Sequence, residues 1–399
     1  MINAVLDISN IFYRSMYITG GYGKKGYTFD SQKEIDELVR KVAIDVSFTL
    51  RQINASRVIF AIDSRSWRKD IEIEENEGYK SHRKKADYLN WDNIYSAMDD
   101  FCSIMNDKGL ITSKIEGAEA DDLMCLWKDE LLFNQKQHVI LVSGDEDIRQ
   151  LVSFNPYEQG EIIISAVFNP FTQGKNSKKK LFVPSVFNEW LEKEDETVDI
   201  FNRNIDSDKE AFIKLTNDNQ VVFEVLDGEE VALRKIFCGD TGDNVPAIYS
   251  WKGQTKKGDP KDFRITEAKY KKIIETIRPV NLQKNFSNRI DYIDLSDHLD
   301  LIYKELQEIS GQKPSFKMKD RLKRQIKLVV LDSLEFPENI VNKFKEQIED
   351  NLAKVPDKIS GWHMNSLLEG TRYIDENYQR SKNEASIFKD IDKISKQLF

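Results

Sequence analysis

The sequence predicts an α/β fold in which a mostly parallel central sheet is flanked by helices and followed by a helical C-terminal domain. Three continuous apolar runs, of the kind found in buried parallel strands, each end in an aspartate, at Asp7, Asp63 and Asp145. Apolar residues at helical spacing over 91–105 and 120–132 predict helices that cover this sheet. Because sites in open α/β sheets form beyond the carboxyl ends of the strands, we expect the three aspartates to converge.

The later part of the chain is less regular. Apolar runs at 161–168 and 180–183 predict two further strands, separated by a basic turn. Residues 188–230 read as a more acidic insertion, and apolar segments on either side of turn-forming residues predict a hairpin over 211–226. A helix is expected at 229–237, and helical patterns dominate from there to the end of the sequence.

The composition is that of a sizeable globular protein. The chain has 399 residues, of which 40% are hydrophobic and 32% charged, enough for two domains or one large elaborated domain. It contains no apolar run long enough to cross a membrane and no signal-like start, so we expect a soluble, cytoplasmic protein without a membrane partner. Three cysteines without metal-ligand spacing are expected to be buried free thiols rather than zinc ligands or disulfides.

The net charge of −9 argues at first against a nucleic-acid partner, because phosphate binding relies on Lys and Arg. The distribution of charge matters more than the sum. Basic residues gather at 175–180, 252–272 and 313–327. Each run by itself is more often a solvated face than a binding site, but three such runs in a chain with clustered carboxylates favour nucleic acid as the partner.

The segment Gly117–Asp122 carries three carboxylates in four residues, at the start of the helix expected over 120–132. Carboxylates this close repel one another by up to about 4 kcal/mol per pair at an effective dielectric constant near 20. An acidic helix start that complements the helix macrodipole is the alternative explanation. There are two further acidic segments. Ser143–Asp147 follows a predicted strand, and Gly239–Asn244 lies in a turn-rich loop. So many carboxylates at one crevice require cations.

The stretch between Asp63 and Gly117 contains aromatic residues among basic ones. Trp67 and Arg68 come shortly after the predicted strand end, and Tyr79–Lys85 follows an acidic segment. Aromatic rings can stack on bases while Lys and Arg contact phosphates. An exposed amphipathic helix is the alternative, but the position beside a candidate ligand favours the nucleic-acid interpretation.

Three motifs together resemble the signatures of the structure-specific 5′-nucleases, the family of flap endonucleases and 5′–3′ exonucleases. They are Glu119–Asp122, Ser143–Asp147 and Gly239–Asn244, in this order and context. The resemblance covers nearly the whole chain and is strongest for the phage branch of the family that removes RNA primers. It implies a PIN-like, metal-dependent 5′-nuclease core at 1–187 with a helical arch at about 64–115. It also implies a helical C-terminal domain at 231–399 with a helix-turn-helix-like duplex-binding element.

The resemblance implies a two-cation active site. Its first metal ligands would be Asp7, Asp63, Glu119 and Asp121, and its second Asp145, Asp147 and Asp240, with Asp243 nearby. Asp121 and Asp145 are also counted as catalytic. Two Mg²⁺ ions are expected, with Mn²⁺ as a substitute, because hard cations prefer oxygen ligands. On an ideal helix Glu119 and Asp121 lie on opposite sides of the apolar face that contains Ala120. Their carboxylates therefore converge only if Glu119 is at or before the first helical residue.

Basic residues that match the family's pattern are expected to contact the substrate. Lys80 and Arg83 resemble the basic pair of the arch, which grips the scissile phosphate, and are counted as catalytic. The other expected nucleic-acid contacts are Arg68, Lys84, Lys252, Lys256 and Lys257. The last three lie in a lysine-rich loop at 249–258, where the family usually has a shorter glycine-rich one, so we expect a salt-sensitive duplex contact.

The resemblance therefore implies a Mg²⁺-dependent nuclease that hydrolyses phosphodiester bonds at the 5′ ends of RNA primers or DNA flaps on duplex DNA during replication. Expected partners are duplex DNA with a 5′ RNA primer, flap or nick, and a single-strand-binding protein or sliding clamp, which a C-terminal helix at 375–399 could dock. We expect a monomer, located in the cytoplasm of the host cell if the chain is viral. The alternatives are a nucleic-acid-binding replication factor that has lost catalysis on the same fold, and a compact PIN-type ribonuclease.

Overall fold

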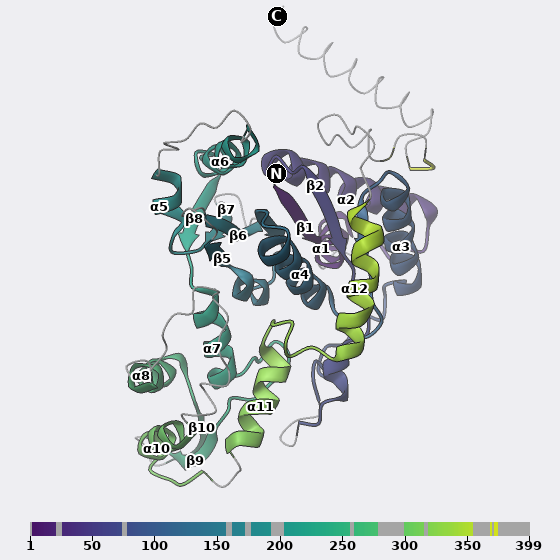
Figure 1. Cartoon of the computed structure of the whole chain (residues 1–399). Helices are drawn as coiled ribbons and strands as arrows, with labels where there is room; N and C mark the ends of the chain where they lie inside the picture. Colours follow the sequence, from purple (N-terminus) through teal and green to yellow (C-terminus); the bar gives the residue numbers. More distant parts are fainter. Residues whose placement is uncertain are drawn as a thin grey trace, which may run out of the picture. The chain divides into compact units, whose positions relative to one another are not determined.

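The computed structural model of the chain is drawn in Figure 1. It describes residues 2–20, 26–73, 78–156, 162–171, 177–192, 203–255, 259–277, 299–314, 318–353, 368 and 371–373. The chain divides into two compact units. The first consists of residues 1–10, 55–86 and 113–353, and the second of residues 11–54, 87–112 and 354–399.

The first unit is built on a mixed, mostly parallel sheet. Its strands are β1 (Asn3–Asp7), β2 (Arg57–Ala61), β3 (Ile111–Ser113), β4 (Val139–Val142), β5 (Ser153–Pro156), β6 (Ile162–Asn169), β7 (Lys179–Val183) and β8 (Val221–Val225). The order is β3-β2-β1-β4-β6-β7-β8, with β5 paired to β6 and with Ser113 of β3 belonging to this unit. β1 runs parallel to β2 and β4, and β4 runs parallel to β6. β7 is antiparallel to β6, and β8 is parallel to β7.

The helices of the first unit cover this sheet or follow it. They are α4 (Ala120–Asp129), α5 (Phe187–Glu192), α6 (Arg203–Thr216), α7 (Gly228–Cys238), α8 (Glu267–Ile277), α10 (Leu299–Ser310), α11 (Met318–Val329) and α12 (Glu338–Leu352), with short turns at Trp67–Asp70, Glu130–Asn134 and Asp147–Leu151. α4 packs against β1, β2 and β4 and buries Leu123 and Trp127 completely. Trp127 meets Phe344 of α12 edge to face, with ring centroids 5.1 Å apart.

A second hydrophobic core lies among α7, α8, α10 and α11, the helices drawn in the lower part of Figure 1. Buried Phe237, Tyr270, Leu306 and Ile326 belong to it. A β-hairpin of β9 (Ser250–Gln254) and β10 (Pro260–Arg264) lies between α7 and α8 in the chain. Gln325 of α11 donates from Nε2 to the carbonyl oxygen of Pro246 at 2.6 Å, which ties this core to the end of the Asp240 loop.

The second unit contains α1 (Ile8–Gly20), whose first turn belongs to the first unit, with α2 (Gln32–Gln52) and α3 (Trp91–Asp107). Phe12 and Phe101 meet edge to face at 5.7 Å, and Ser31 caps α2 by accepting from the Glu34 amide. Tyr373 donates its hydroxyl to Asp100 at 2.6 Å. The C-terminal helix expected at 375–399 lies outside the described residues.

Most predicted elements are confirmed, including the three strands that end near aspartates and the helices α3, α4 and α7. The hairpin predicted over 211–226 is wrong in its first half, because 211–216 is the end of helix α6. Ala211, Phe212 and Leu215 are buried at helical spacing. The second half is β8, which extends the main sheet instead of forming a separate insertion.

The lysine-rich loop expected at 249–258 begins with β9, so a β-hairpin stands where a helix-turn-helix-like element was predicted. Of the free thiols, Cys102 and Cys125 are buried and Cys238 is half-buried. Within the described part of the chain, no helix combines the length and apolar character needed to cross a membrane.

Candidate active site

Asp7 sits at the carboxyl end of β1, in the middle of the parallel part of the sheet. Its Oδ1 accepts the Asn10 amide at 2.8 Å, and its Oδ2 accepts the hydroxyl of Ser143, just beyond β4, at 3.2 Å. Asp63, which follows β2, and Asp145, which follows β4, are held by similar hydrogen bonds. The Asp63 amide donates to the Ser9 hydroxyl at 3.0 Å, and the Asp145 amide donates to the Ser143 hydroxyl at 3.1 Å. The convergence of strand ends predicted from the apolar runs is therefore present.

The acidic segment before α4 is fixed by capping. Asp63 accepts the amide of Ala120, the first residue of α4, at 2.8 Å. Glu119 is the N-cap residue and forms a capping box with Asp122, whose Oδ2 accepts the Glu119 amide at 3.1 Å. Glu119 thus lies just before the first helical residue, which is the condition under which Glu119 and Asp121 can converge.

Negative charge accumulates where these segments meet. Burial, followed by repulsion from Asp63 and Asp145, raises the pKa of Asp7 well above its ordinary value. Burial and the charges of Asp145 and Asp7 do the same for the pKa of Asp121. Burial also raises the pKa of Asp63. A cluster of this kind is favourable only when a cation compensates it, and its donors are all carboxylate oxygens, which suit a hard divalent ion.

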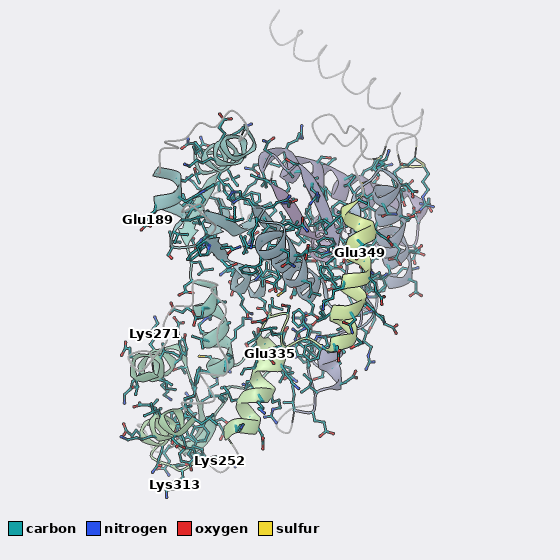
Figure 2. All side chains as sticks on the ribbon, viewed as in Figure 1. Glu189, Lys252, Lys271, Lys313, Glu335 and Glu349 are labelled. Atoms are coloured by element: carbon teal, nitrogen blue, oxygen red, sulfur yellow. The ribbon has the colours of Figure 1, made fainter. Side chains whose placement is uncertain are left out.

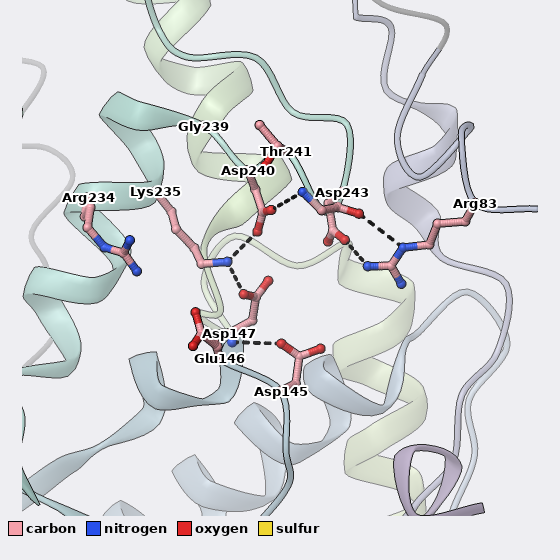
Figure 3. Close-up of a pocket in the computed structure, with 11 residues that line it drawn as sticks. Arg83, Asp145, Glu146, Asp147, Arg234, Lys235, Gly239, Asp240, Thr241 and Asp243 are labelled. Carbon is pink, nitrogen blue, oxygen red and sulfur yellow. Dashed lines mark hydrogen bonds and ion pairs between the residues drawn. The ribbon is translucent and has the colours of Figure 1, made fainter. Parts of the chain in front are cut away.

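A second acidic cluster contains Asp147, Asp240 and Asp243, which offer carboxylate oxygens within 4.8 Å of one another. They line a cavity of about 350 Å³, together with Asp145 and Arg83 (Figure 3). Asp145 connects the two clusters, because its Oδ1 accepts the Asp147 amide at 2.9 Å and its charge also acts on Asp7. The acids of the two expected ligand sets therefore lie close to one another, and Asp145 of the second set also acts electrostatically on Asp7 and Asp121 of the first. Their assignment to individual metal ions stays a prediction.

Lys235, which the sequence analysis did not single out, lies between two of these acids. Its Nζ donates to both Asp147 and Asp240, as Figure 3 shows. Burial raises the pKa of Asp147 to about 6, despite the opposing effect of Lys235. Burial would also raise the pKa of Asp240, but Lys235 lowers it below its ordinary value. A positive charge thus already occupies the space between two candidate metal ligands.

Tyr79, Lys80 and Arg83 connect Glu119 to Asp243. Lys80 Nζ lies 2.5 Å from Glu119 and 3.6 Å from Asp243, and Arg83 forms an ion pair with Asp243. The Tyr79 hydroxyl donates to Asp243 at 2.9 Å and lies 3.1 Å from Glu119. Burial would raise the pKa of Glu119, but Lys80 and Arg68 lower it. Both predicted basic residues are therefore in the site, and Tyr79 is a further member that the sequence analysis left unassigned.

The local backbone around Lys80 is a turn, not the helix implied for the arch. Gly78 has φ 116° and Lys80 has φ 55°, and both values are incompatible with a right-handed helix. The Lys80 amide donates to the carbonyl oxygen of Asp243 at 2.8 Å, and Asn244 donates to that of Gly78 at 2.9 Å. The turn is thus fastened directly to the Asp240–Asn244 loop.

Arg68 is a correction, because it is buried and not available to a phosphate. Only 2% of its surface is exposed, and its Nη1 lies 2.7 Å from Asp122. Its guanidinium also lies over the rings of Trp67 and Phe336. The pattern of basic and aromatic residues suggested a surface contact, whereas the side chain neutralises an acid inside the protein.

The other expected nucleic-acid contacts have different positions. Lys84 is exposed after the Lys80 turn, and Lys252 is exposed on β9 (Figure 2). Lys256 and Lys257 lie outside the described residues. The roles of Lys84 and Lys252 stay predictions.

Gly239 shapes the loop that carries Asp240 and Asp243. It has φ 72°, and an added Cβ would lie 2.5 Å from the carbonyl carbon of Pro246. We expect Gly239→Ala to lower the free energy of unfolding by roughly 2–4 kcal/mol in urea titrations. Gly311→Ala is the matched control, because Gly311 has φ 68° but open space around it, and strain alone should cost about 1 kcal/mol. Equal losses for the two variants would contradict the close approach.

The raised pKa values predict how stability of the metal-free protein depends on pH. Between the ordinary carboxyl pKa and the raised values, the folded state binds more protons than the unfolded state, so the free energy of unfolding falls as pH rises. In EDTA, thermal unfolding should therefore occur at lower temperature at pH 7.5 than at pH 5.5. Asp121→Asn should raise the midpoint at pH 7.5 and flatten the profile, whereas exposed Asp107→Asn should not. A profile unchanged by Asp121→Asn would contradict the charge accumulation.

Comparisons with known proteins identify a domain and several similar structures. Residues 3–176 match the family model for the N-terminal, resolvase-like domain of 5′-3′ exonucleases. No curated protein sequence matches this chain. A T5 protein co-crystallised with metal ions is 16% identical to this chain. The match covers 88% of this chain and 99% of the T5 chain, with a TM-score of 0.43. A variant of the bacteriophage T5 flap endonuclease, in a complex with DNA and metal ions, is 15% identical to this chain. The match covers 88% of this chain and 100% of that one, with a TM-score of 0.40.

Proposed function

Because the chain belongs to the 5′-nuclease family through its 5′-3′ exonuclease domain at residues 3–176, we propose that it is a divalent-metal-dependent, structure-specific nuclease. It hydrolyses phosphodiester bonds at the 5′ ends of RNA primers or DNA flaps on duplex DNA, during replication. The observation that carries this proposal is the meeting of two acidic clusters at Asp145. This residue lines one cavity with Asp147, Asp240 and Asp243, and its charge also acts on the buried Asp7 and on Asp121.

The residues present fit the cations that this reaction needs. Asp147, Asp240 and Asp243 offer three oxygens at close range, and Asp7, Asp121 and Asp145 interact electrostatically as a second acidic group. Mg²⁺ is the proposed ion, because it is held by few carboxylates and keeps several of its waters. When bound in such a site, two divalent ions can activate a water and stabilise the attacking and leaving oxygens.

The basic residues have a separate task. Lys80 is paired with Glu119 and Arg83 with Asp243, and Arg83 and Asp243 line the cavity. In the proposed mechanism, their charges hold the phosphate that is cut and stabilise the negative charge that develops on it. Tyr79 positions them, because its hydroxyl joins the same two acids. The exposed Lys84 and Lys252 would contact the nucleic acid farther from the reacting phosphate.

Cleavage products of end-labelled substrates test the proposal. The same RNA–DNA primer on a DNA template is labelled at its 5′ or its 3′ end, and nicked and flap DNA substrates are compared in Mg²⁺ and in EDTA. The proposal expects short products from the 5′-labelled strand in Mg²⁺ alone. Shortening from the 3′ end, or tight binding without cleavage in Mg²⁺ or Mn²⁺, would overturn it; the second result would indicate the inactive replication factor.

A further inference from the structure

Helix α11 presents a row of lysines to solvent. Lys319, Lys323 and Lys327 are all exposed and occupy positions i, i+4 and i+8, so about 6 Å of helix separates each from the next. The buried face of the helix, which carries Leu322, Ile326 and Val329, packs in the second core. Like charges at this spacing destabilise a helix by a few tenths of a kcal/mol per pair, so the lysine row does not serve the stability of the helix.

The lysine row leads into a groove of about 840 Å³ that is separate from the acidic cavity. Lys327 lines the groove, and Glu335, labelled in Figure 2, lines it in the turn that follows α11. Lys323 and Lys327 both act electrostatically on Glu335. Further along, the groove has two more cations, Arg65 and Lys343.

Apolar and aromatic side chains form another part of the groove. Trp67 and Phe336 meet edge to face with ring centroids 6.5 Å apart, and Arg68 supports both from beneath. Leu334, in the same lining, is 74% exposed. A surface that combines rings with flanking cations suits unstacked bases and their phosphates.

The far end of the groove reaches the acidic segment before α4. Ser66 and Gly117 line the groove. The Ser66 hydroxyl donates to Glu119 at 2.7 Å, and the Trp67 amide donates to the carbonyl oxygen of Gly117 at 2.8 Å. A nucleic-acid strand in this groove would therefore contact Ser66, whose side chain is hydrogen-bonded to Glu119 of the candidate active site.

We propose that the lysine row and this groove bind a single-stranded arm of the nucleic-acid substrate. The lysines contact successive backbone phosphates, and the apolar part of the groove, formed by Trp67, Leu334 and Phe336, receives bases. A single strand is the better occupant because a duplex keeps its bases stacked and paired, and so cannot present them to this surface. The inference rests on the proposed function for its purpose, but its test requires no cleavage.

The test measures binding by fluorescence anisotropy in EDTA, with a labelled oligothymidylate and with a blunt duplex, over a range of salt concentrations. The variant is Lys319→Gln, Lys323→Gln and Lys327→Gln together. Each phosphate contact in a single strand contributes about 0.7 to the slope of log K against log salt, so the slope should become less steep by about 2. The affinity for the single strand should fall by at least about tenfold at low salt, and the affinity for the blunt duplex should change little.

A charge-matched control separates the lysine row from net charge. Lys33→Gln, Lys214→Gln and Lys304→Gln together remove three exposed lysines from other helices, and should leave the slope near that of the wild type. The row variant should unfold at the same temperature as the wild type or higher, because like charges are removed. An unchanged single-strand slope, or an equal loss for blunt duplex, would overturn the inference. Failure of the nuclease proposal would appear separately, as absent cleavage by the wild type in Mg²⁺.

Discussion

Asp121→Asn is expected to reduce the rate of cleavage about a thousandfold, a loss of about 4 kcal/mol of transition-state stabilisation. Asp121 follows the N-cap of α4, and its carboxylate lies in the field of Asp7 and Asp145. The amide keeps the shape of the side chain but removes the charge that a divalent cation requires. Single-turnover cleavage of a 5′-labelled primer in Mg²⁺ measures the effect.

The same variant should fold and bind well. In EDTA, Asp121→Asn should bind the substrate at least as tightly as the wild type, because one negative charge near the phosphate is gone. Asp107→Asn, an exposed substitution of the same type, should cleave at the rate of the wild type. Cleavage by Asp121→Asn within a few fold of the wild type would show that this acid is not part of the catalytic site.

Arg68→Met should lower the free energy of unfolding by about 3–5 kcal/mol, the second largest effect that we expect. The substitution leaves the buried carboxylate of Asp122 without its 2.7 Å partner. It also removes the guanidinium from the Trp67 and Phe336 rings. Urea unfolding monitored by circular dichroism measures the change.

The neighbouring Arg65 provides a matched control. Its ion pair with Asp70 is 2.8 Å long, but the two side chains are 70% and 67% exposed, so Arg65→Met should cost less than about 1 kcal/mol. Arg68→Met combined with Asp122→Asn should be less destabilised than the sum of the single variants, because no unpaired charge stays buried. Additive losses would show that the pair is not coupled.

Patterns among a few neighbouring residues predicted the strands and helices whose positions depend mainly on those residues. The strands that end near Asp7, Asp63 and Asp145 are short apolar runs, and α4 follows an acidic N-terminal segment, so each is visible in a few neighbouring residues. The hairpin prediction over 211–226 failed because apolar residues around a turn are compatible with either a strand or the end of a helix. Burial of Phe212 on α6 and pairing of β8 with β7 decided between them.

The candidate site shows the same division. Its acids stand in recognisable motifs, and the structure brings them together, but their partners come from distant segments. Tyr79 joins Asp243 across 164 residues, and Lys235 reaches Asp147 across 88. Arg68 misled because its charge suggests exposure, while the acid that neutralises it lies 54 residues away. Long-range pairs of this kind leave no local signal in one sequence.

The most direct test of the central claim is the dependence of cleavage on divalent cation, measured with EDTA-treated protein and a 5′-labelled flap substrate. The account predicts no cleavage without a divalent ion, a rate that rises with added Mg²⁺ or Mn²⁺, and loss of this response in Asp121→Asn and Asp145→Asn. Cleavage that persists in EDTA, or intact substrate at every Mg²⁺ and Mn²⁺ concentration while binding is retained, would contradict it.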